Sequence, residues 1–211
     1  MEKYVLGVSG CSGSGKSEIV NQLKNKTSSK LISIISQDNY YKTKENQMID
    51  ENGVHNFDLP DSIDHERFYA DIMLLLSGKK VRYKKYTYNN PRKIPKTRFI
   101  SSCPIIVIEG LFIYHYEKIR KLCHSKVFID AKKKNMIKRR IKRDLEERGY
   151  DRNDVEYRYK NHVIPAFNKF TEPYKNSSDL IIFNNEEIHS PVKCLKDFLI
   201  QEYNKYKKLL S

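Results

Sequence analysis

Short apolar runs alternate along the chain with longer segments in which apolar residues recur at helical spacing. We expect strands at residues 4–8, 31–35, 104–108, 127–129 and 180–182. We expect helices at residues 16–23, 63–76, 132–148, 154–167 and from 191 onward. Alternating strands and helices are typical of a mostly parallel sheet with helices on both faces, so the pattern predicts a three-layer α/β fold.

Residues 78–98 break this alternation. They are basic and rich in tyrosine, and Pro91 and Pro95 interrupt them, which indicates a small β-hairpin or loop insertion. No internal repeat and no Ser/Gly-rich linker divides the chain. Its 211 residues are enough for one well-buried core and few for two, so residues 1–211 are predicted to form one domain.

The composition is that of a globular domain, with 39% hydrophobic and 31% charged residues. No run approaches the roughly 20 apolar residues that a membrane helix needs. The first three residues, Met-Glu-Lys, lead directly into an apolar strand and not into an export signal. We therefore expect a cytoplasmic location and no membrane partner.

The four cysteines lie far apart, without a CxxC pair or a Cys/His cluster at zinc spacing, and we expect them to be reduced thiols. Cys11 is either an unusually acidic thiol or a small residue that suits its loop.

A formal net charge of +14 raises the question of nucleic-acid binding. However, Lys, Asn, Ile and Tyr are all plentiful, as an A/T-rich coding sequence would produce, and much of the charge could be solvated surface lysine. Nucleic acid is therefore not expected to be the main ligand.

Residues 10–17 read GCSGSGKS and match the phosphate-loop motif G-x-x-x-x-G-K-[ST] between a predicted strand and a predicted helix. Glycines let the backbone turn its N–H groups toward phosphate oxygens, and the helix adds its N-terminal dipole. Lys16 would reach the β- and γ-phosphates, and the Ser17 hydroxyl would bind magnesium. A Gly/Ser-rich turn is the alternative. We expect ATP with Mg2+ at this loop, held by Gly10, Ser12, Gly13, Ser14, Gly15, Lys16 and Ser17.

Two carboxylates follow predicted strands and should meet the loop at the same edge of the sheet. Asp38 could face the magnesium, or accept the proton of an attacking hydroxyl. Glu109 ends a buried apolar run, where a charge without a cation would be costly, so it is the expected outer partner of magnesium. The alternatives are a turn or N-cap aspartate and a solvent-exposed strand-end glutamate.

Arginine and lysine gather in the predicted helix at residues 138–148, and Arg140 and Arg143 share a helix face. Arginines on a lid can neutralise the charge of a transferred phosphoryl group and exclude water. A solvated helix with Arg/Glu pairs is an equally good interpretation. A nucleic-acid stripe is weaker, because Asp144, Glu146 and Glu147 interrupt the run.

Several segments in this order resemble the uridine/cytidine kinase family, from about residue 3 to residue 183. They are GVSGCSGSGKS at 7–17, ISQDNYY at 35–41, NFDLPDSID at 56–64, IEG at 108–110 and RRIKRDLEERG at 139–149. The resemblance implies a P-loop fold with an arginine-rich lid at about 139–158 and an acceptor-side insertion at about 78–98.

The resemblance also implies roles for single residues. Asp38 would be the general base for the ribose 5′-hydroxyl and a magnesium-side group, with Lys16 and Arg140 as further catalytic residues. Metal contacts would come from Ser17, Asp38 and Glu109, and lid contacts to ATP from Arg143 and Arg148. The nucleoside would be held by Tyr41, Phe57, Asp58, Tyr86, Arg140 and Arg158.

Three positions depart from the family pattern in the part that reads the base or closes the lid. Pro91 stands where the family usually has a histidine, Arg158 where it has a glutamine, and Tyr150 where it has a lid arginine. The ATP site therefore matches the family better than the base-reading site does.

The sequence thus predicts an ATP-dependent kinase that phosphorylates uridine or cytidine for pyrimidine salvage. One alternative is a sibling kinase acting on another small hydroxyl compound, such as nicotinamide riboside or a sugar phosphate. Another is a basic P-loop protein that binds nucleotide or nucleic acid without transferring phosphate. A homo-oligomer is compatible with the family, but no residue indicates an interface.

Overall fold

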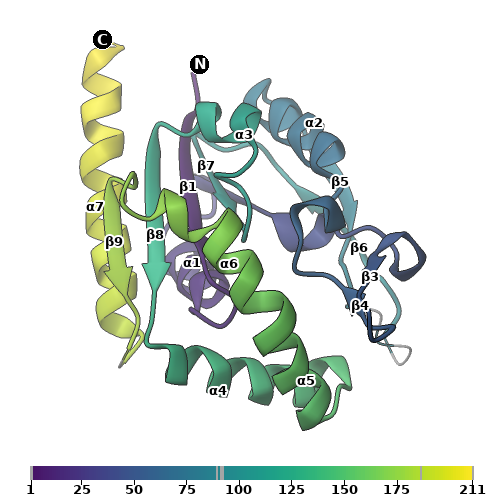
Figure 1. Ribbon diagram of the computed structural model, residues 1–211. Coiled ribbons are helices and arrows are strands. Elements are labelled where there is room, and N and C mark those ends of the chain that lie inside the picture. Colours follow the sequence, from purple (N-terminus) through teal and green to yellow (C-terminus); the bar gives the residue numbers. More distant parts are fainter. Residues whose placement is uncertain (1, 89, 91–92, 186, 211) are drawn as a thin grey trace.

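The computed structural model describes residues 2–88, 90, 93–185 and 187–210 (Figure 1). Within them, five parallel strands form one sheet in the order β2-β7-β1-β8-β9. The strands are β1 (Tyr4–Gly10), β2 (Ile32–Ser36), β7 (Ile105–Glu109), β8 (Ser125–Asp130) and β9 (Leu180–Phe183). Each predicted strand is present, and the predicted three-layer α/β fold is confirmed.

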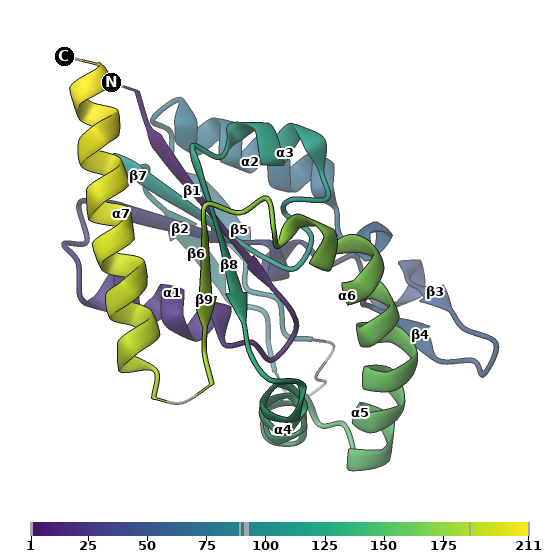
Figure 2. The ribbon, with the colours of Figure 1, turned by 60° about the vertical axis from the view of Figure 1, so that its left-hand side comes forward.

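Helices cover both faces of this sheet (Figure 2). On one face lie α1 (Lys16–Asn25) and α7 (His189–Leu209), which contact each other. On the other lie α2 (His65–Leu76), which begins two residues later than predicted, and α3 (Glu117–Leu122), which the sequence analysis missed. The start of α2 follows its N-cap, because the Asp64 carboxylate accepts a hydrogen bond from the Arg67 N–H.

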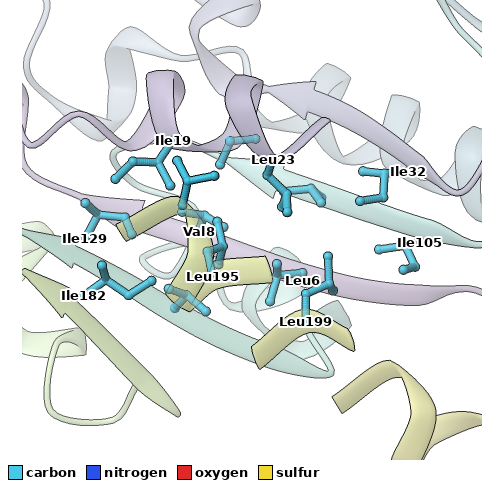
Figure 3. Close-up of a cluster of buried hydrophobic side chains, with 14 of the residues drawn as sticks. Leu6, Val8, Ile19, Leu23, Ile32, Ile105, Ile129, Ile182, Leu195 and Leu199 are labelled. Atoms are coloured by element: carbon cyan, nitrogen blue, oxygen red, sulfur yellow. The ribbon is translucent and has the colours of Figure 1, made fainter. Parts of the chain in front are cut away.

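Alternation along the central strand divides the core into two halves. Leu6 and Val8 of β1 lie with Ile19 and Leu23 of α1 in the cluster that also contains residues of α7 (Figure 3). Val5 belongs to the cluster on the opposite face, with residues of α2 and α3. Because β1 is buried from both sides, its carboxyl end is held firmly at the point where the strand order reverses, which is where ligands of such sheets bind.

A third, smaller cluster attaches the lid to the phosphate loop. It consists of Cys11, Ala131, Met136, Tyr159 and Val163, all buried. The predicted lid, about residues 139–158, falls within α4 (Lys133–Arg143), a π-helical turn η4 (Asp144–Arg148) and α5 (Arg152–Arg158), which a second π turn η5 (Tyr159–Val163) and α6 (Ile164–Phe170) follow. Figure 1 shows α4 below the end of β8, running from there toward α5.

Two antiparallel hairpins stand outside the sheet. The predicted insertion is the hairpin of β5 (Val81–Lys84) and β6 (Thr97–Ile100). The hairpin of β3 (Met48–Ile49) and β4 (His55–Asn56) was not predicted, because two-residue strands leave no periodicity. The part of the chain that the structure describes also contains the 3-10 turns η1 (Gln37–Tyr40), η2 (Lys44–Asn46), η3 (Pro60–Ser62) and η6 (Glu172–Tyr174).

Two further sequence expectations can be compared with this fold. All four cysteines lie in the described part of the chain and are free thiols. Among the described residues, no helix has the length and apolarity needed to cross a bilayer. That residues 1–211 form one domain stays a prediction.

The approach of α4 to the phosphate loop generates a testable prediction at Gly13. Gly13 has φ +83°, and a Cβ there would lie 2.3 Å from the Met136 carbonyl oxygen of α4. Gly53 has φ +76° with no atom within 4 Å of such a Cβ, so Gly53→Ala is a matched control for backbone strain alone. We expect Gly53→Ala to lower the free energy of unfolding by about 1 kcal/mol and Gly13→Ala by several kcal/mol. Urea titration of both variants measures the difference, and equal losses would contradict this packing.

Candidate active site

The phosphate loop connects β1 to α1 in the geometry that its motif requires. Gly15 is the residue before α1 and has a left-handed backbone, with φ +90°. The loop is held from outside by Asn184, whose Nδ2 donates to the Ser14 carbonyl at 2.8 Å. A Cβ at Gly15 would lie 2.2 Å from that nitrogen, so the position has room only for glycine. The loop N–H groups and Lys16 therefore form a cradle suited to phosphate oxygens.

Oxygen ligands for a hard cation lie beside this cradle. The Ser17 hydroxyl donates to Glu109 Oε2 at 3.0 Å, and Glu109 is 3% exposed at the end of β7. Burial and the nearby Asp38 carboxylate raise the pKa of Glu109, and Lys16 opposes them. Among the described residues no group of three or more His, Cys, Asp or Glu could hold a metal by itself. One or two carboxylates and a hydroxyl still fit Mg2+, which commonly completes its shell with water and substrate phosphates.

Asp38 lies in η1, directly after β2, and reaches a hydroxyl in the cavity. Its Oδ2 accepts a hydrogen bond from the Tyr88 hydroxyl at 2.8 Å. Tyr88 has φ +55°, and the Arg148 guanidinium lies 3.8 Å from the centre of its ring. Burial raises the pKa of Tyr88, and so does the Asp38 charge. The tyrosine hydroxyl thus stands beside the carboxylate where an acceptor hydroxyl would have to bind.

Most of the predicted site residues line one cavity next to the loop. They are Ser12, Lys16, Ser17, Asp38, Tyr41, Phe57, Asp58, Tyr86, Arg140, Arg143, Arg148 and Arg158. Gly10, Gly13, Ser14 and Gly15 shape the loop, and Glu109 lines a neighbouring cavity together with Ser17 and Asp38. The first cavity has a volume of about 60 Å3, well below the roughly 300 Å3 of a small ligand pocket. A ligand of ordinary size would therefore fit only if lining side chains such as Tyr88 moved.

Aromatic rings form one wall of this cavity. The Tyr41 and Tyr86 rings are stacked with centroids 5.2 Å apart, and Phe57 meets Tyr41 edge-on at 6.3 Å. Tyr86 meets Tyr88 edge-on at 5.1 Å. Burial, followed by the Asp38 charge, raises the pKa of Tyr41 well above its usual value. Flat apolar faces of this kind suit a planar ring such as a nucleobase.

Arg140 connects the loop to the acceptor side of the cavity. Its Nη1 donates to Ser12 Oγ at 2.9 Å, and its two terminal nitrogens lie 3.2 and 3.3 Å from the Asp58 carboxylate oxygens. Arg140 and Asp58 are both buried, so the pair is shielded from water. The arrangement leaves Asp58 in place to accept hydrogen bonds from hydroxyl groups of an acceptor.

The β3–β4 hairpin, which directly precedes Phe57, is tied to the lid. Asp50 Oδ2 accepts a hydrogen bond from the Tyr157 hydroxyl at 2.7 Å and lies 2.7 Å from His162 Nε2. Arg158 donates from Nη1 to the His55 carbonyl. Movement of the lid is therefore coupled to the loop that carries Phe57 and Asp58.

Two departures from the family pattern lie in the same cavity wall. Arg158 and Tyr150 both line the cavity, with the Arg158 guanidinium carbon 5.1 Å from the centre of the Tyr150 ring. Arg158 Nε is held by Asp154, 2.9 and 3.0 Å from its two carboxylate oxygens. Pro91 lies outside the described residues.

The structure adds site residues that sequence analysis did not select. Tyr88 touches Asp38, and Asp144 contacts three of the arginines. Asn184 supports the loop from a turn after β9, distant in sequence. Tyr88 lies two residues after Tyr86 in the insertion, and this spacing could have indicated that it belongs to the site. No sequence pattern indicated Asn184.

The surroundings of Cys11 support the interpretation that it is a small residue that suits its loop. The side chain is 2% exposed, and burial raises the pKa of its thiol to about 12 although Lys16 and Arg140 oppose this. The thiol is therefore un-ionised at neutral pH and serves as a small buried residue.

Comparison with known proteins agrees with this geometry. A family model described as "Phosphoribulokinase / Uridine kinase family" matches residues 5–189. A uridine kinase of Vibrio atlanticus is 32% identical over 182 residues, which cover 84% of this chain and 85% of that protein.

Solved structures share the fold at lower sequence identity. A structure described as "a possible uridine kinase" from Bacillus stearothermophilus has a TM-score of 0.60 at 16% identity, covering 86% of this chain and 89% of that one. A D-glycerate 3-kinase from Cryptococcus neoformans has a TM-score of 0.59 at 12% identity, covering 87% and 86%. This chain thus shares its fold with both of these structures. Because the family model matches well over half of its residues, this chain belongs to the phosphoribulokinase/uridine kinase family.

Proposed function

We propose that this protein is an ATP-dependent nucleoside kinase that transfers the γ-phosphate to the 5′-hydroxyl of uridine or cytidine. One observation carries the proposal: a carboxylate, Asp38, already accepts a hydrogen bond from a hydroxyl inside a cavity that Lys16 and Ser17 also line. The family relationship supports a phosphotransferase, and the aromatic wall supports an acceptor with a planar base.

In the proposed reaction Asp38 takes the proton of the 5′-hydroxyl as its oxygen attacks the γ-phosphorus. The oxygen forms a bond to phosphorus, and the bond between the γ-phosphorus and the bridging β–γ oxygen breaks. Asp58 orients the acceptor by accepting hydrogen bonds from the ribose hydroxyls, and Arg140 keeps Asp58 in place. Lys16, Arg143 and Arg148 neutralise charge on the transferred group.

A magnesium ion fits beside Ser17, Asp38 and Glu109, and when bound it would neutralise charge on the β- and γ-phosphates. Glu109 and Ser17 hold each other in position for this role. An acceptor hydroxyl that binds at Asp38 Oδ2 would take the place of the Tyr88 hydroxyl.

A sibling kinase with another hydroxyl acceptor is the second candidate. Arg158 and Tyr150 favour it, because both line the cavity where the family usually has glutamine and arginine. The similarity to a D-glycerate 3-kinase concerns only the fold, but that protein shows that the fold serves other acceptors. ATP consumption measured against ribonucleosides, deoxyribonucleosides, nicotinamide riboside and sugar phosphates separates the two candidates. Turnover with none of the ribonucleosides would exclude our proposal.

The cytoplasmic location, the absence of nucleic-acid binding and a homo-oligomeric state stay predictions.

The general-base role predicts the effect of Asp38→Asn. The asparagine amide cannot take up the proton of the attacking hydroxyl, so we expect kcat to fall by roughly 100-fold or more. The affinity for MgADP should fall far less than kcat, because the phosphate loop, Ser17 and Glu109 are intact. Asp197→Asn on α7, which removes an exposed carboxylate paired with Lys193, is the control and should keep full activity. Retention of most of the activity by Asp38→Asn would remove the base assignment.

Under the proposed function, the side chain at position 158 influences whether cytidine or uridine is the better substrate. A guanidinium only donates hydrogen bonds, so it suits the N3 acceptor of cytosine and not the N3–H of uracil. Glutamine offers both a donor and an acceptor. We therefore expect Arg158→Gln to raise kcat/KM for uridine relative to cytidine by about tenfold, a ratio that corresponds to one hydrogen bond. Arg152→Gln, an exposed lid arginine paired with Glu156, is the matched control and should leave the ratio unchanged.

A further inference from the structure

Asp144 contacts three arginines of the site at once. It is 1% exposed and lies at the junction of α4 and the π turn η4. Its Oδ1 accepts a hydrogen bond from Arg143 Nε at 2.8 Å and lies 3.2 Å from Arg148 Nε. Its Oδ2 lies 3.3 Å from Arg140 Nε. The three cationic side chains that face the phosphate loop therefore share a single carboxylate.

The contacts all involve the inner nitrogen of each guanidinium, as a hydrogen bond for Arg143 and as ion pairs without a hydrogen bond for Arg140 and Arg148. Asp144 therefore does not occupy the terminal nitrogens of the three arginines. Those of Arg140 are bound to Asp58 and Ser12, and the Arg148 group covers the Tyr88 ring. Arg143 Nη2 is buried, and no hydrogen-bond partner for it exists among the described residues. A guanidinium held at its inner edge presents its terminal donors in a defined direction, which suits phosphate oxygens.

Electrostatics require a carboxylate at this place. Without it, three guanidinium groups would be close together in a buried site and would repel one another. Burial and the neighbouring Arg148 lower the pKa of Arg143, against the effect of Asp144. Burial acts to raise the pKa of Asp144, but the charges of Arg143, Arg148 and Arg140 outweigh it and lower that pKa. Asp144 is therefore ionised at neutral pH.

The backbone provides the geometry for this cluster. Arg140 precedes Asp144 by one α-helical turn and Arg148 follows it by four residues, across the π turn. A π turn widens the helix locally, and such turns are frequent at functional sites. Arg140 and Arg148 are thus the i−4 and i+4 neighbours of Asp144, a spacing at which side chains on a helix meet.

We propose that Asp144 is a positioning residue that directs Arg143 and Arg148 toward the γ-phosphate of bound ATP and keeps Arg140 against Asp58 and Ser12. The inference rests on the proposed function, because it assumes a triphosphate in the loop. Asp144 itself touches no substrate in this arrangement and acts only through the arginines.

The test compares two ligands that differ in the γ-phosphate. Calorimetry measures the dissociation constants of MgADP and of the magnesium complex of an imido analogue of ATP that is not hydrolysed. We expect the natural protein to bind the analogue more tightly than MgADP. Asp144→Asn should weaken analogue binding about tenfold, the equivalent of one charge-assisted hydrogen bond, and MgADP binding less than about twofold. It should also lower kcat with cytidine or uridine.

Control variants separate positioning from folding. Glu156→Gln removes another acid of the lid, exposed and paired with Arg152, and should change neither constant. Asp144→Glu keeps the charge but displaces it by one methylene, and should lose about threefold in analogue binding relative to MgADP. This variant decides the question even if Asp144→Asn does not fold.

Three results would overturn the inference. One is equal weakening of both ligands in Asp144→Asn, since a purely structural role affects both. Another is an Asp144→Glu variant that folds and retains the full preference for the analogue. The third is a natural protein that binds the two ligands equally. Failure to phosphorylate any ribonucleoside would count against the proposed acceptor and would leave the two binding constants interpretable.

Discussion

Mutual neutralisation of buried charges at the carboxyl edge of the sheet is the constraint on which this site depends. Lys16, Arg140, Asp58, Asp144 and Glu109 are all buried there. An ionised group in such a place is tolerated only when it is paired and hydrogen-bonded. Each of the carboxylates accordingly has a partner: Asp58 and Asp144 contact arginines, and Glu109 accepts a hydrogen bond from Ser17.

Pairing of this kind also prepares the site for its ligands. The charges hold one another in position before a nucleotide arrives, so little reorganisation is needed when it binds. Asp38 and Glu109 line the same cavity, and burial together with the Asp38 charge raises the pKa of Glu109. Under the proposed function, a divalent cation beside both carboxylates would offset their repulsion.

The acceptor side is organised differently from the phosphate side. It is built from the 3-10 turn after β2, the segment after the β3–β4 hairpin and the insertion that contains Tyr86 and Tyr88. The β3–β4 hairpin is joined to the predicted lid and the turn after it by the contacts of Asp50 with Tyr157 and His162. These contacts connect the segment that carries Phe57 and Asp58 to the arginine-rich helices.

The residues on the phosphate side of the cavity could be predicted from the local sequence pattern, whereas those on the acceptor side could not. The Gly10–Ser17 motif, its strand and its helix are neighbours in sequence, so their chemistry can be inferred without the rest of the chain. Periodicity likewise predicted the five strands, because a strand buried on both faces is a continuous apolar run. The roles of Tyr41, Phe57 and Asp58 came from resemblance alone, since nothing in their spacing indicates that they meet.

Tertiary structure decided which charged groups are buried together. Asp144 seemed to interrupt a basic stripe, yet it contacts Arg140 and Arg148, four residues before and after it, and the fold buries this local cluster at the phosphate loop. Asn184 supports the loop from 170 residues away, through the pairing of β8 with β9. Tyr88 reaches Asp38 across 50 positions, through an insertion whose hairpin is positioned by packing. Sequence determined the elements and the phosphate chemistry, because both depend on near neighbours; the contacts that shape the acceptor site depend on how distant segments pack.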